Sequence, residues 1–281
     1  MTTTSRSEPG IPVLCGSLSR FPSPLGRVMH EAAYRALGLD YRYQPFEIHD
    51  VRAALDAMRA LGIRGCGVSM PFKLEVLEHL DDVDPLAAHI GAVNTIVNQA
   101  GRLTGYNTDA WGARAAFEEE GPLENSRVLL LGAGGAARAV AFAFREAGAR
   151  LTIVNRSAAK ARELARAVEA ELSSDLSLVG ELGDYDAVVN ASSVGMAEVD
   201  PSSPVPARAL RPGLLVQDIV YKPTRTTLVR DALEAGCRVV HGGRMLLHQA
   251  TRQFELYTGE TAPREVMDRE LRRALGEAHL P

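Results

Sequence analysis

Two side chains in the first half of the sequence, Lys73 and Asp109, have the chemistry needed to interconvert a ketone and an alcohol. Hydride transfer to a carbonyl carbon requires a proton donor at the alkoxide that forms. A lysine ammonium can supply that proton, and a carboxylate beside it can orient the lysine and bond a neighbouring substrate hydroxyl. We therefore interpret Lys73 as the donor and Asp109 as its partner. The alternative for Lys73 is an exposed lysine at the start of a helix.

Both residues belong to polar clusters that follow or end predicted strands. The three clusters are Ser69–Lys73, Ala92–Thr95 and Gly105–Asp109. In an open α/β sheet, ligands collect beyond the carboxyl ends of the strands. We therefore expect the three clusters to converge on one substrate site.

A glycine-rich turn at Leu129–Ala137 indicates a dinucleotide site, because an apolar strand runs there into G-x-G-x-x-A and then into a helix. Gly132 permits a sharp turn, Gly134 permits close approach to a pyrophosphate, and Ala137 permits tight packing of helix on strand. The anion would lie on free amides at the helix N-terminus. Glycines of this kind also form turns that bind nothing. The residues expected at the pyrophosphate are Gly132, Ala133, Gly134, Gly135 and Ala136.

The end of the next strand decides which dinucleotide is preferred. An acidic residue about 20 positions beyond the glycine turn would bind the ribose 2′-hydroxyl of NAD. This chain has Asn155, Arg156 and Ser157 there, with Lys160 shortly after. Two cations suit a 2′-phosphate, so the pattern favours NADP. The alternative is a solvated helix start, which leaves the missing acid unexplained.

The elements that must position these residues form two α/β domains. We predict a first domain of residues 1–108, completed by helical residues 244–281 that return to it, and a dinucleotide-binding domain of residues 109–243. In the first, Asp50 caps a helix and the last two strands form an antiparallel pair. Its predicted strands are 12–15, 41–46, 65–69, 92–98 and 102–106, and its helices follow the apolar faces of 28–37 and 51–61.

The second domain alternates strands and helices, which predicts a parallel, doubly wound sheet of the Rossmann type. A helix from about Asp109 to Glu120 precedes it and stops at Gly121-Pro122. The predicted strands are 127–131, 150–154, 185–191, 214–220 and 237–240, and the predicted helices are 134–147, 158–171, 243–258 and 264–275.

Composition excludes several other classes of protein. The 281 residues carry 31 basic and 35 acidic side chains, a formal charge of −4, so no overall positive field exists for nucleic acid or an anionic membrane. The first ten residues lack the apolar core of a signal peptide, which favours a cytoplasmic protein. Three cysteines and seven histidines show no disulfide or metal-ligand spacing. We expect reduced cysteines and no metal.

These residues lie in an order that resembles the shikimate dehydrogenase family over nearly the whole chain. The shared motifs are V-S-M-P-F-K at 68–73, G-A-V-N-T at 91–95, N-T-D at 107–109, G-A-G-G-A-A-R at 132–138, N-R-S at 155–157, N-A-S at 190–192 and M-L-L-x-Q at 245–249, with Tyr221 and Gly242. The resemblance implies a two-domain enzyme that reduces 3-dehydroshikimate to shikimate with NADPH, in the biosynthesis of chorismate and aromatic amino acids. It also implies that Lys73 and Asp109 are the catalytic pair.

The resemblance further implies the residues that bind each ligand. The substrate's ring hydroxyls and carboxylate would bind Ser69, Asn94, Asn107, Tyr221 and Gln249. The coenzyme would be bordered by Asn190, Ala191, Ser192 and Met245, with Gly242 near the nicotinamide.

The N-terminal loop departs from the family pattern, in which two serines of S-x-S-P bind the substrate carboxylate. Here the loop is longer, S-L-S-R-F-P-S-P at 17–24, and resembles the shikimate dehydrogenase-like branch. Ser17, Ser19 or Ser23 is expected at the carboxylate, Arg20 could replace them, and a polar loop without ligand contact is the other interpretation. This departure leaves three alternatives open: a quinate dehydrogenase, an aminoshikimate dehydrogenase, and a weakly active NADP-binding protein with a sensor role. The expected partner is a small molecule, and the protein is expected to be a monomer or homodimer.

Overall fold

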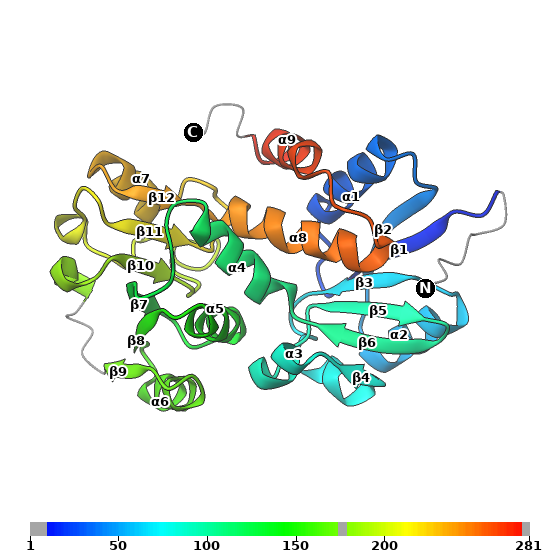
Figure 1. Ribbon diagram of the computed structural model, residues 1–281, viewed down its shortest axis with the longest axis horizontal. Coiled ribbons are helices and arrows are strands. Elements are labelled where there is room, and N and C mark those ends of the chain that lie inside the picture. The colour runs from blue at the N-terminus through cyan, green and yellow to red at the C-terminus, as the bar shows by residue number, and fades with distance from the viewer. Residues whose placement is uncertain (1–9, 174–178, 277–281) are drawn as a thin grey trace. The chain divides into compact units, whose positions relative to one another are not determined.

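The computed structural model describes residues 10–173 and 179–276 (Figure 1). Its contacts divide the chain into two compact units. The first unit takes residues up to Thr108 and from Ala250 onward, and the second takes Asp109–Gln249. The chain therefore passes between the units at the start of helix α4 (Thr108–Glu118) and again within helix α8 (Gly242–Thr258).

The first unit is built on a six-stranded mixed sheet in the order β2-β1-β3-β5-β6-β4. Strands β1, β2 and β3 are parallel, whereas β5 is antiparallel to both β3 and β6, so the predicted antiparallel pair is confirmed. The strands are β1 (Val13–Ser19), β2 (Tyr41–Glu47), β3 (Gly65–Val68), β4 (Asp82–Val83), β5 (Thr95–Gln99) and β6 (Arg102–Tyr106).

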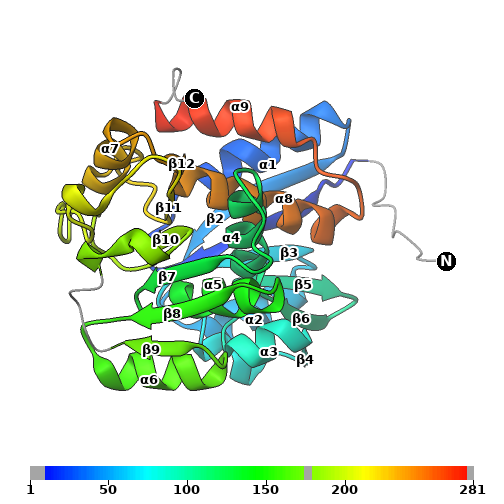
Figure 2. The same cartoon turned by 60° about the vertical axis from the view of Figure 1, so that its left-hand side comes forward.

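The helices of the first unit come from both ends of the chain. The Asp50 side chain accepts a hydrogen bond from Ala53 N at 3.0 Å and so caps α2, as predicted. Helix α9 packs on α1, which brings the C-terminal part of the chain back to the first unit (Figure 2). The helices are α1 (Leu25–Ala36), α2 (Val51–Ala60), α3 (Pro85–Ile90), α9 (Arg264–Leu275) and the short 3-10 helix η1 (Glu75–His79).

Helix α3 and strand β4 were absent from the sequence prediction. A local signal for α3 did exist, because Asp84 caps the helix by accepting a hydrogen bond from Leu86 N at 3.0 Å, and Pro85 occupies the first helical position. Strand β4 has two residues and is defined by its pairing with β6. A strand that short carries no periodicity of its own.

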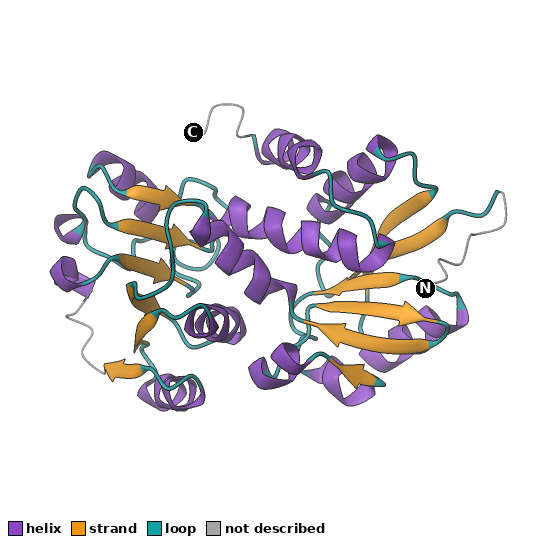
Figure 3. Ribbon diagram, in the orientation of Figure 1, coloured by secondary structure: helices purple, strands orange, loops and turns teal. Residues whose placement is uncertain are grey.

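The second unit is a parallel sheet in the order β12-β11-β10-β7-β8-β9, which confirms the predicted doubly wound fold. Helices flank its strands (Figure 3). The strands are β7 (Arg127–Leu131), β8 (Arg150–Val154), β9 (Glu171–Ser173), β10 (Ala187–Asn190), β11 (Leu215–Asp218) and β12 (Arg238–Val240). The helices beside α4 are α5 (Gly135–Glu146), α6 (Ala158–Ala167), α7 (Thr227–Glu234) and the 3-10 helices η3 (Leu182–Asp184) and η4 (Ala207–Ala209).

The predicted helix over 158–171 is wrong at its C-terminal end. Helix α6 stops at Ala167, Glu169 takes a left-handed φ of 51°, and the chain then pairs as β9 with β8. Pairing with a sheet edge is a tertiary effect that overrides the helical propensity of the segment. Helix α7 was not predicted, although Thr226 caps it by accepting from Val229 N at 3.1 Å.

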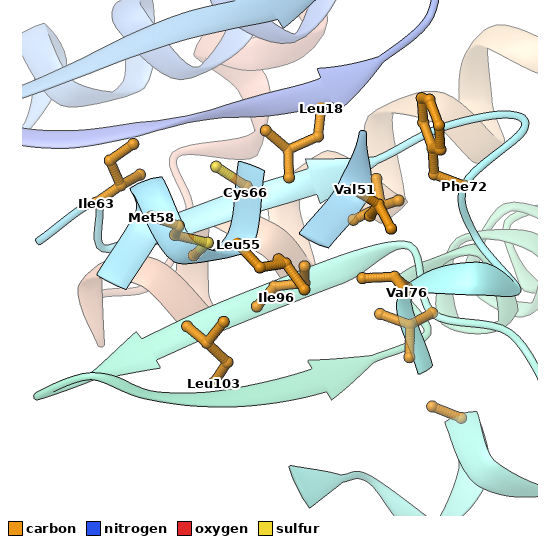
Figure 4. Close-up of a cluster of buried hydrophobic side chains, with 13 residues drawn as sticks. Leu18, Val51, Leu55, Met58, Ile63, Cys66, Phe72, Val76, Ile96 and Leu103 are labelled. Atoms are coloured by element: carbon orange, nitrogen blue, oxygen red, sulfur yellow. The ribbon is translucent and has the colours of Figure 1, made fainter. Parts of the chain in front are cut away.

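An apolar cluster beneath the first unit's sheet anchors one of the polar loops (Figure 4). Leu18 at the end of β1 and Phe72 in the Ser69–Lys73 loop both belong to it, with exposed fractions of 3% and 4%. Burial of Phe72 fixes the backbone next to Lys73, because moving that backbone would expose an aromatic ring.

Within the described part of the chain, the side chains hold no cluster of His, Cys, Asp or Glu suited to a metal ion. No described helix combines the length and apolar character that a membrane crossing requires. Cys15, Cys66 and Cys237 are buried thiols.

Replacing Leu55 by alanine should lower the free energy of unfolding by about 2–5 kcal/mol, because it opens a cavity at a fully buried position. Urea denaturation followed by circular dichroism measures the change. Leu61→Ala is the matched control, since Leu61 is 71% exposed at the end of the same helix. Equal losses in the two variants would contradict the assignment of the core.

Candidate active site

The second and third polar clusters are joined by the side chain of Asn94, which is 3% exposed. Its Oδ1 accepts hydrogen bonds from Thr108 N at 2.6 Å, from Thr108 Oγ1 at 3.2 Å and from Thr95 Oγ1 at 3.0 Å. Asn107 adds a further link by donating from Nδ2 to Ala92 O at 3.0 Å. These bonds connect the loop that enters β5 with the loop that leaves β6, so the A-V-N-T and N-T-D motifs form one polar junction.

The Ser69–Lys73 loop lies against that junction. Val93 N donates to Lys73 O at 2.9 Å, and Val68 N donates to Asn94 O at 2.7 Å. Ser69 N donates to Leu18 O at 3.0 Å, which ties the loop to the end of β1. Ser69 is exposed and Lys73 is half-buried. The first unit therefore brings together the segments that carry Ser69, Lys73, Asn94 and Asn107. The Ala92–Thr95 cluster precedes β5 instead of following a strand, and it reaches this edge because β5 is antiparallel to β3.

The residues of the N-terminal loop are placed differently from one another. Ser17 is half-buried opposite Gly67 on β3 and hydrogen-bonds Tyr43. Ser19 is 4% exposed, and its Oγ has no hydrogen-bond partner within residues 10–173 and 179–276. Ser23 Oγ accepts from Leu25 N at 3.4 Å at the start of α1. Arg20 is exposed and donates from Nη1 to His49 Nδ1 at 2.6 Å.

In the second unit, the glycine turn has the shape that a pyrophosphate requires. Gly132 has a left-handed φ of 119°, and a Cβ there would lie 2.7 Å from Ala191 O. Among residues 10–173 and 179–276, nothing beyond the adjoining backbone lies within 4 Å of a Cβ built on Gly134 or Gly135, so the turn is open where the anion would approach. Gly134 precedes the first turn of α5 without a side-chain cap, which leaves that turn's amides for an anion. These residues fit a bound dinucleotide.

The basic residues after β8 occupy the position that distinguishes the two dinucleotides. Gly132 N donates to Val154 O at 2.9 Å, so the glycine turn and the end of β8 are neighbours. Asn155 Nδ2 donates to Ser157 O at 3.0 Å and shapes the following turn. Arg156, Ser157 and Lys160 are exposed. Hydrogen bonds from Ser202, together with the charge of Arg156, hold the pKa of Asp200 below its usual value.

Helices α4 and α8 bring other predicted site residues together. A Cβ on Gly112 would lie 2.7 Å from Met245 O and 2.9 Å from Gln249 N, so the two helices touch backbone to backbone there. Asp109 lies one helical turn before Gly112 on the same face of α4. The second unit therefore packs Gln249 against Gly112, one helical turn after Asp109.

The chain after β11 reaches the start of α8. A Cβ on Gly242 would meet the carbonyl oxygens of Val220 and Ile219, the latter at 2.6 Å. This close approach sets Gly242 directly beside the segment that leads into Tyr221, which is half-buried.

An ion pair also joins the end of α4 to the start of α8. Arg244 donates two hydrogen bonds to Glu119, at 2.8 Å and 2.6 Å, and His248 Nε2 lies 2.9 Å from Glu119 Oε1. Burial alone would raise the pKa of Glu119, but the hydrogen bonds from Arg244 and His248 outweigh it and lower the pKa to about 2. The bidentate geometry orients α8 on α4.

Sequence reasoning missed the residues that hold the polar junction rather than form its surface. Thr95 Oγ1 lies 2.9 Å from Thr108 Oγ1, and Gln253 Nε2 donates to Thr95 Oγ1 at 3.0 Å. Thr95 and Thr108 stand inside the motifs, so motif membership was an available signal. No local pattern pairs Gln253 on α8 with Thr95, because the two residues lie 158 positions apart in the sequence.

Comparison with known proteins agrees with this arrangement of an α/β substrate unit and a dinucleotide-binding unit. Three family models match the chain: the shikimate dehydrogenase substrate binding domain at residues 22–96, shikimate / quinate 5-dehydrogenase at residues 113–205, and the shikimate 5'-dehydrogenase C-terminal domain at residues 242–272.

Individual relatives match over almost the whole chain. The chain is 43% identical to the shikimate dehydrogenase (NADP(+)) of Methanothermobacter thermautotrophicus, over 90% of this chain and 94% of the relative. Shikimate 5-dehydrogenase from Thermus thermophilus, solved in complex with NADP(H) and shikimate, has a TM-score of 0.86 and 37% identity over 94% of this chain and 100% of its own. Quinate dehydrogenase from Corynebacterium glutamicum, solved with NAD, has a TM-score of 0.84 and 32% identity over 92% and 98%.

The fold and site define a two-domain α/β protein with a dinucleotide-binding domain. More narrowly, the chain belongs to the shikimate dehydrogenase family, which confirms the resemblance seen in the motifs.

Replacing Glu119 by glutamine should remove a contribution to stability that depends on pH. Because the folded pKa lies below the ordinary 4.5, that contribution is present above pH 4.5 and is lost as the pH falls through about 2. We expect the free energy of unfolding of the wild type to exceed that of Glu119→Gln by about 2 kcal/mol at pH 7. Near pH 2 the two values should differ little. Denaturation at several pH values measures this difference.

Glu163→Gln is the matched control for that experiment. Glu163 pairs with Arg138 but is 76% exposed, so its loss should cost less than about 0.5 kcal/mol. If the difference in free energy of unfolding between the wild type and Glu119→Gln stayed constant with pH, the role of the Glu119 charge would be contradicted.

Proposed function

We propose that this protein is an NADP-dependent shikimate dehydrogenase that reversibly reduces 3-dehydroshikimate to shikimate. The observation that carries the proposal is the match over nine-tenths of the chain to a relative of that name, at 43% identity, with every motif of the polar junction and the glycine turn present. The Thermus thermophilus neighbour was solved with NADP(H) and shikimate, and those ligands fit the chemistry of this chain's residues.

In the proposed reaction, NADPH when bound supplies the hydride to the ketone carbon. Lys73 Nζ donates a proton to the oxygen that becomes the alcohol, and the charge that would develop on that oxygen is thereby neutralised. The Asp109 carboxylate accepts hydrogen bonds from the lysine and from the adjacent ring hydroxyl, so it orients both donor and substrate. In the reverse direction Lys73 accepts the proton.

The remaining proposed contacts hold the substrate by its hydroxyls and its carboxylate. Ser69 is exposed in its loop, Tyr221 follows the segment that lies against Gly242, and Gln249 packs against Gly112 on α4, so each suits a role in binding. The bonds to Asn94 Oδ1 and from Asn107 Nδ2 hold both amides in fixed orientations within the polar junction. This keeps these two proposed substrate contacts in place before the substrate arrives.

For the carboxylate we propose Ser17 over the other residues of the N-terminal loop. Ser17 is half-buried at the carboxyl end of β1, next to the Ser69 loop. Arg20 is exposed and bonded to His49, and Ser23 Oγ accepts from Leu25 N at the start of α1. The altered loop, together with likeness to a quinate dehydrogenase, makes quinate the second candidate substrate. We propose a monomer or homodimer acting on small molecules.

Lys73→Ala should reduce turnover about 10²- to 10⁴-fold while leaving NADPH binding intact, because only proton transfer is removed. Lys73→Arg is the matched variant: it keeps the charge but cannot release a proton, so it should be as inactive. Stopped-flow mixing of NADPH with 3-dehydroshikimate measures loss of reduced-coenzyme absorbance, and fluorescence titration measures binding.

Wild-type rates in Lys73→Arg would show that charge rather than proton transfer is required. A wild type that binds NADPH but shows no oxidation of it with 3-dehydroshikimate or dehydroquinate would overturn the proposed enzyme in favour of a coenzyme sensor.

Arg156→Ala and Lys160→Ala should each raise the KM for NADP about tenfold and leave the KM for NAD unchanged, because each loses one pairing with the 2′-phosphate. Arg162→Ala is the control, because Arg162 is an exposed cation on the same helix as Lys160. Steady-state kinetics with shikimate and quinate against both coenzymes measures the effect. Equal changes for NADP and NAD would contradict the proposed role of these cations.

A further inference from the structure

We propose that Asp218 is a positioning residue for the coenzyme: its buried carboxylate holds the loop after β10 against the glycine turn. This inference rests on the proposed coenzyme use. Asp218 ends β11 and so belongs neither to the glycine turn nor to the basic residues after β8.

The position of Asp218 in the sheet places it at the coenzyme edge. It is the last residue of β11 and is paired in register with Asn190, the last residue of β10. Asn190 is paired in turn with Leu131, the last residue of β7, directly before Gly132. Three neighbouring parallel strands therefore end side by side, and the glycine turn leaves from one of them.

The Asp218 carboxylate is fully buried and accepts three hydrogen bonds from uncharged groups. Oδ1 accepts from Asn190 Nδ2 at 2.9 Å and from Val220 N at 3.1 Å, and Oδ2 accepts from Thr226 Oγ1 at 2.7 Å. Burial raises its pKa to about 6 although the three donors lower it, so near pH 7 the group is mainly an anion that only accepts.

Through Asn190 the carboxylate controls the loop that follows β10. Asn190 has no exposed surface, and its Nδ2 also donates to Val194 O at 2.8 Å. Its Oδ1 accepts from Ser192 N at 3.1 Å and from Ser192 Oγ at 2.6 Å. Asp218 thus fixes which way the Asn190 amide faces, since only the NH₂ end can donate to a carboxylate.

That loop forms one wall of the glycine turn. A Cβ on Gly132 would lie 2.7 Å from Ala191 O and 3.2 Å from Ser192 N. A turned amide at Asn190 would present its NH₂ group to the donor Ser192 N, lose that bond and move this wall. Gly195, at the far end of the loop, has φ 104° and a would-be Cβ 3.7 Å from Asp218 Oδ2, so the carboxylate also packs where the loop returns.

The two oxygens of the carboxylate permit a test that separates positioning from stability. Asp218→Asn keeps the shape but replaces one acceptor by a donor. Asn190→Ala removes the link to the loop and leaves the link to Thr226. Thr226→Val removes the link to α7 and leaves the loop, and Thr226→Ser restores the hydroxyl.

We expect Asp218→Asn and Asn190→Ala each to raise the Kd for NADPH about tenfold, and the double variant to be little worse than either. The kcat of Asp218→Asn at saturating coenzyme should stay within about threefold. Thr226→Val should lower the thermal midpoint with little change in Kd, and Thr226→Ser should restore the midpoint. Thr152→Val is the control, because it removes a buried hydroxyl from the middle of β8. Fluorescence titration measures the Kd, steady-state kinetics measures the kcat, and thermal melts measure the midpoint.

An Asp218→Asn protein that melts lower but binds NADPH with wild-type affinity would overturn the inference, as would fully additive effects of the two loop variants. Failure of the wild type itself to bind NADPH would instead refute the proposed function. The two failures are therefore distinguishable.

Discussion

The hydrogen bonds accepted by the Asn94 side-chain oxygen are the interaction on which the candidate site depends. They join the loop before β5 to Thr108, where the chain leaves the first unit. Because a buried amide oxygen costs free energy unless it is satisfied, the two loops are held together even without a ligand. Lys73 is tied to the same junction through its backbone carbonyl, so its side chain starts from a fixed point.

The second unit uses a different device, the close approach of backbone to backbone at glycine. Gly112 admits α8 onto α4, Gly132 admits the loop after β10, and Gly242 admits the end of β11. Each contact leaves no room for a Cβ. A side chain at these positions would push apart the elements that carry the predicted coenzyme and substrate residues, so small size explains these glycines, and at Gly132 the left-handed φ of 119° is a second reason.

Prediction from the sequence succeeded where the signal was local. The alternation of apolar strands with amphipathic helices predicted the parallel sheet, and the cap at Asp50 was correct. It failed at β9, where pairing with a sheet edge overrode helical periodicity, and at α3, whose Asp84 cap precedes only a short helix. Propensity reports on neighbours within a few positions, whereas pairing depends on strands far away in the chain.

The sequence by itself determined the class of fold, the glycine turn with basic residues in place of an acid, and membership of the shikimate dehydrogenase family. These are properties of residue types at short, ordered spacings. Only the tertiary structure decided which polar side chains serve the scaffold: Asn94, Asn190 and Asp218 are buried and bonded to partners on other elements. The physical reason is that a hydrogen-bond partner is chosen by distance in space, which the order of residues along the chain does not encode locally.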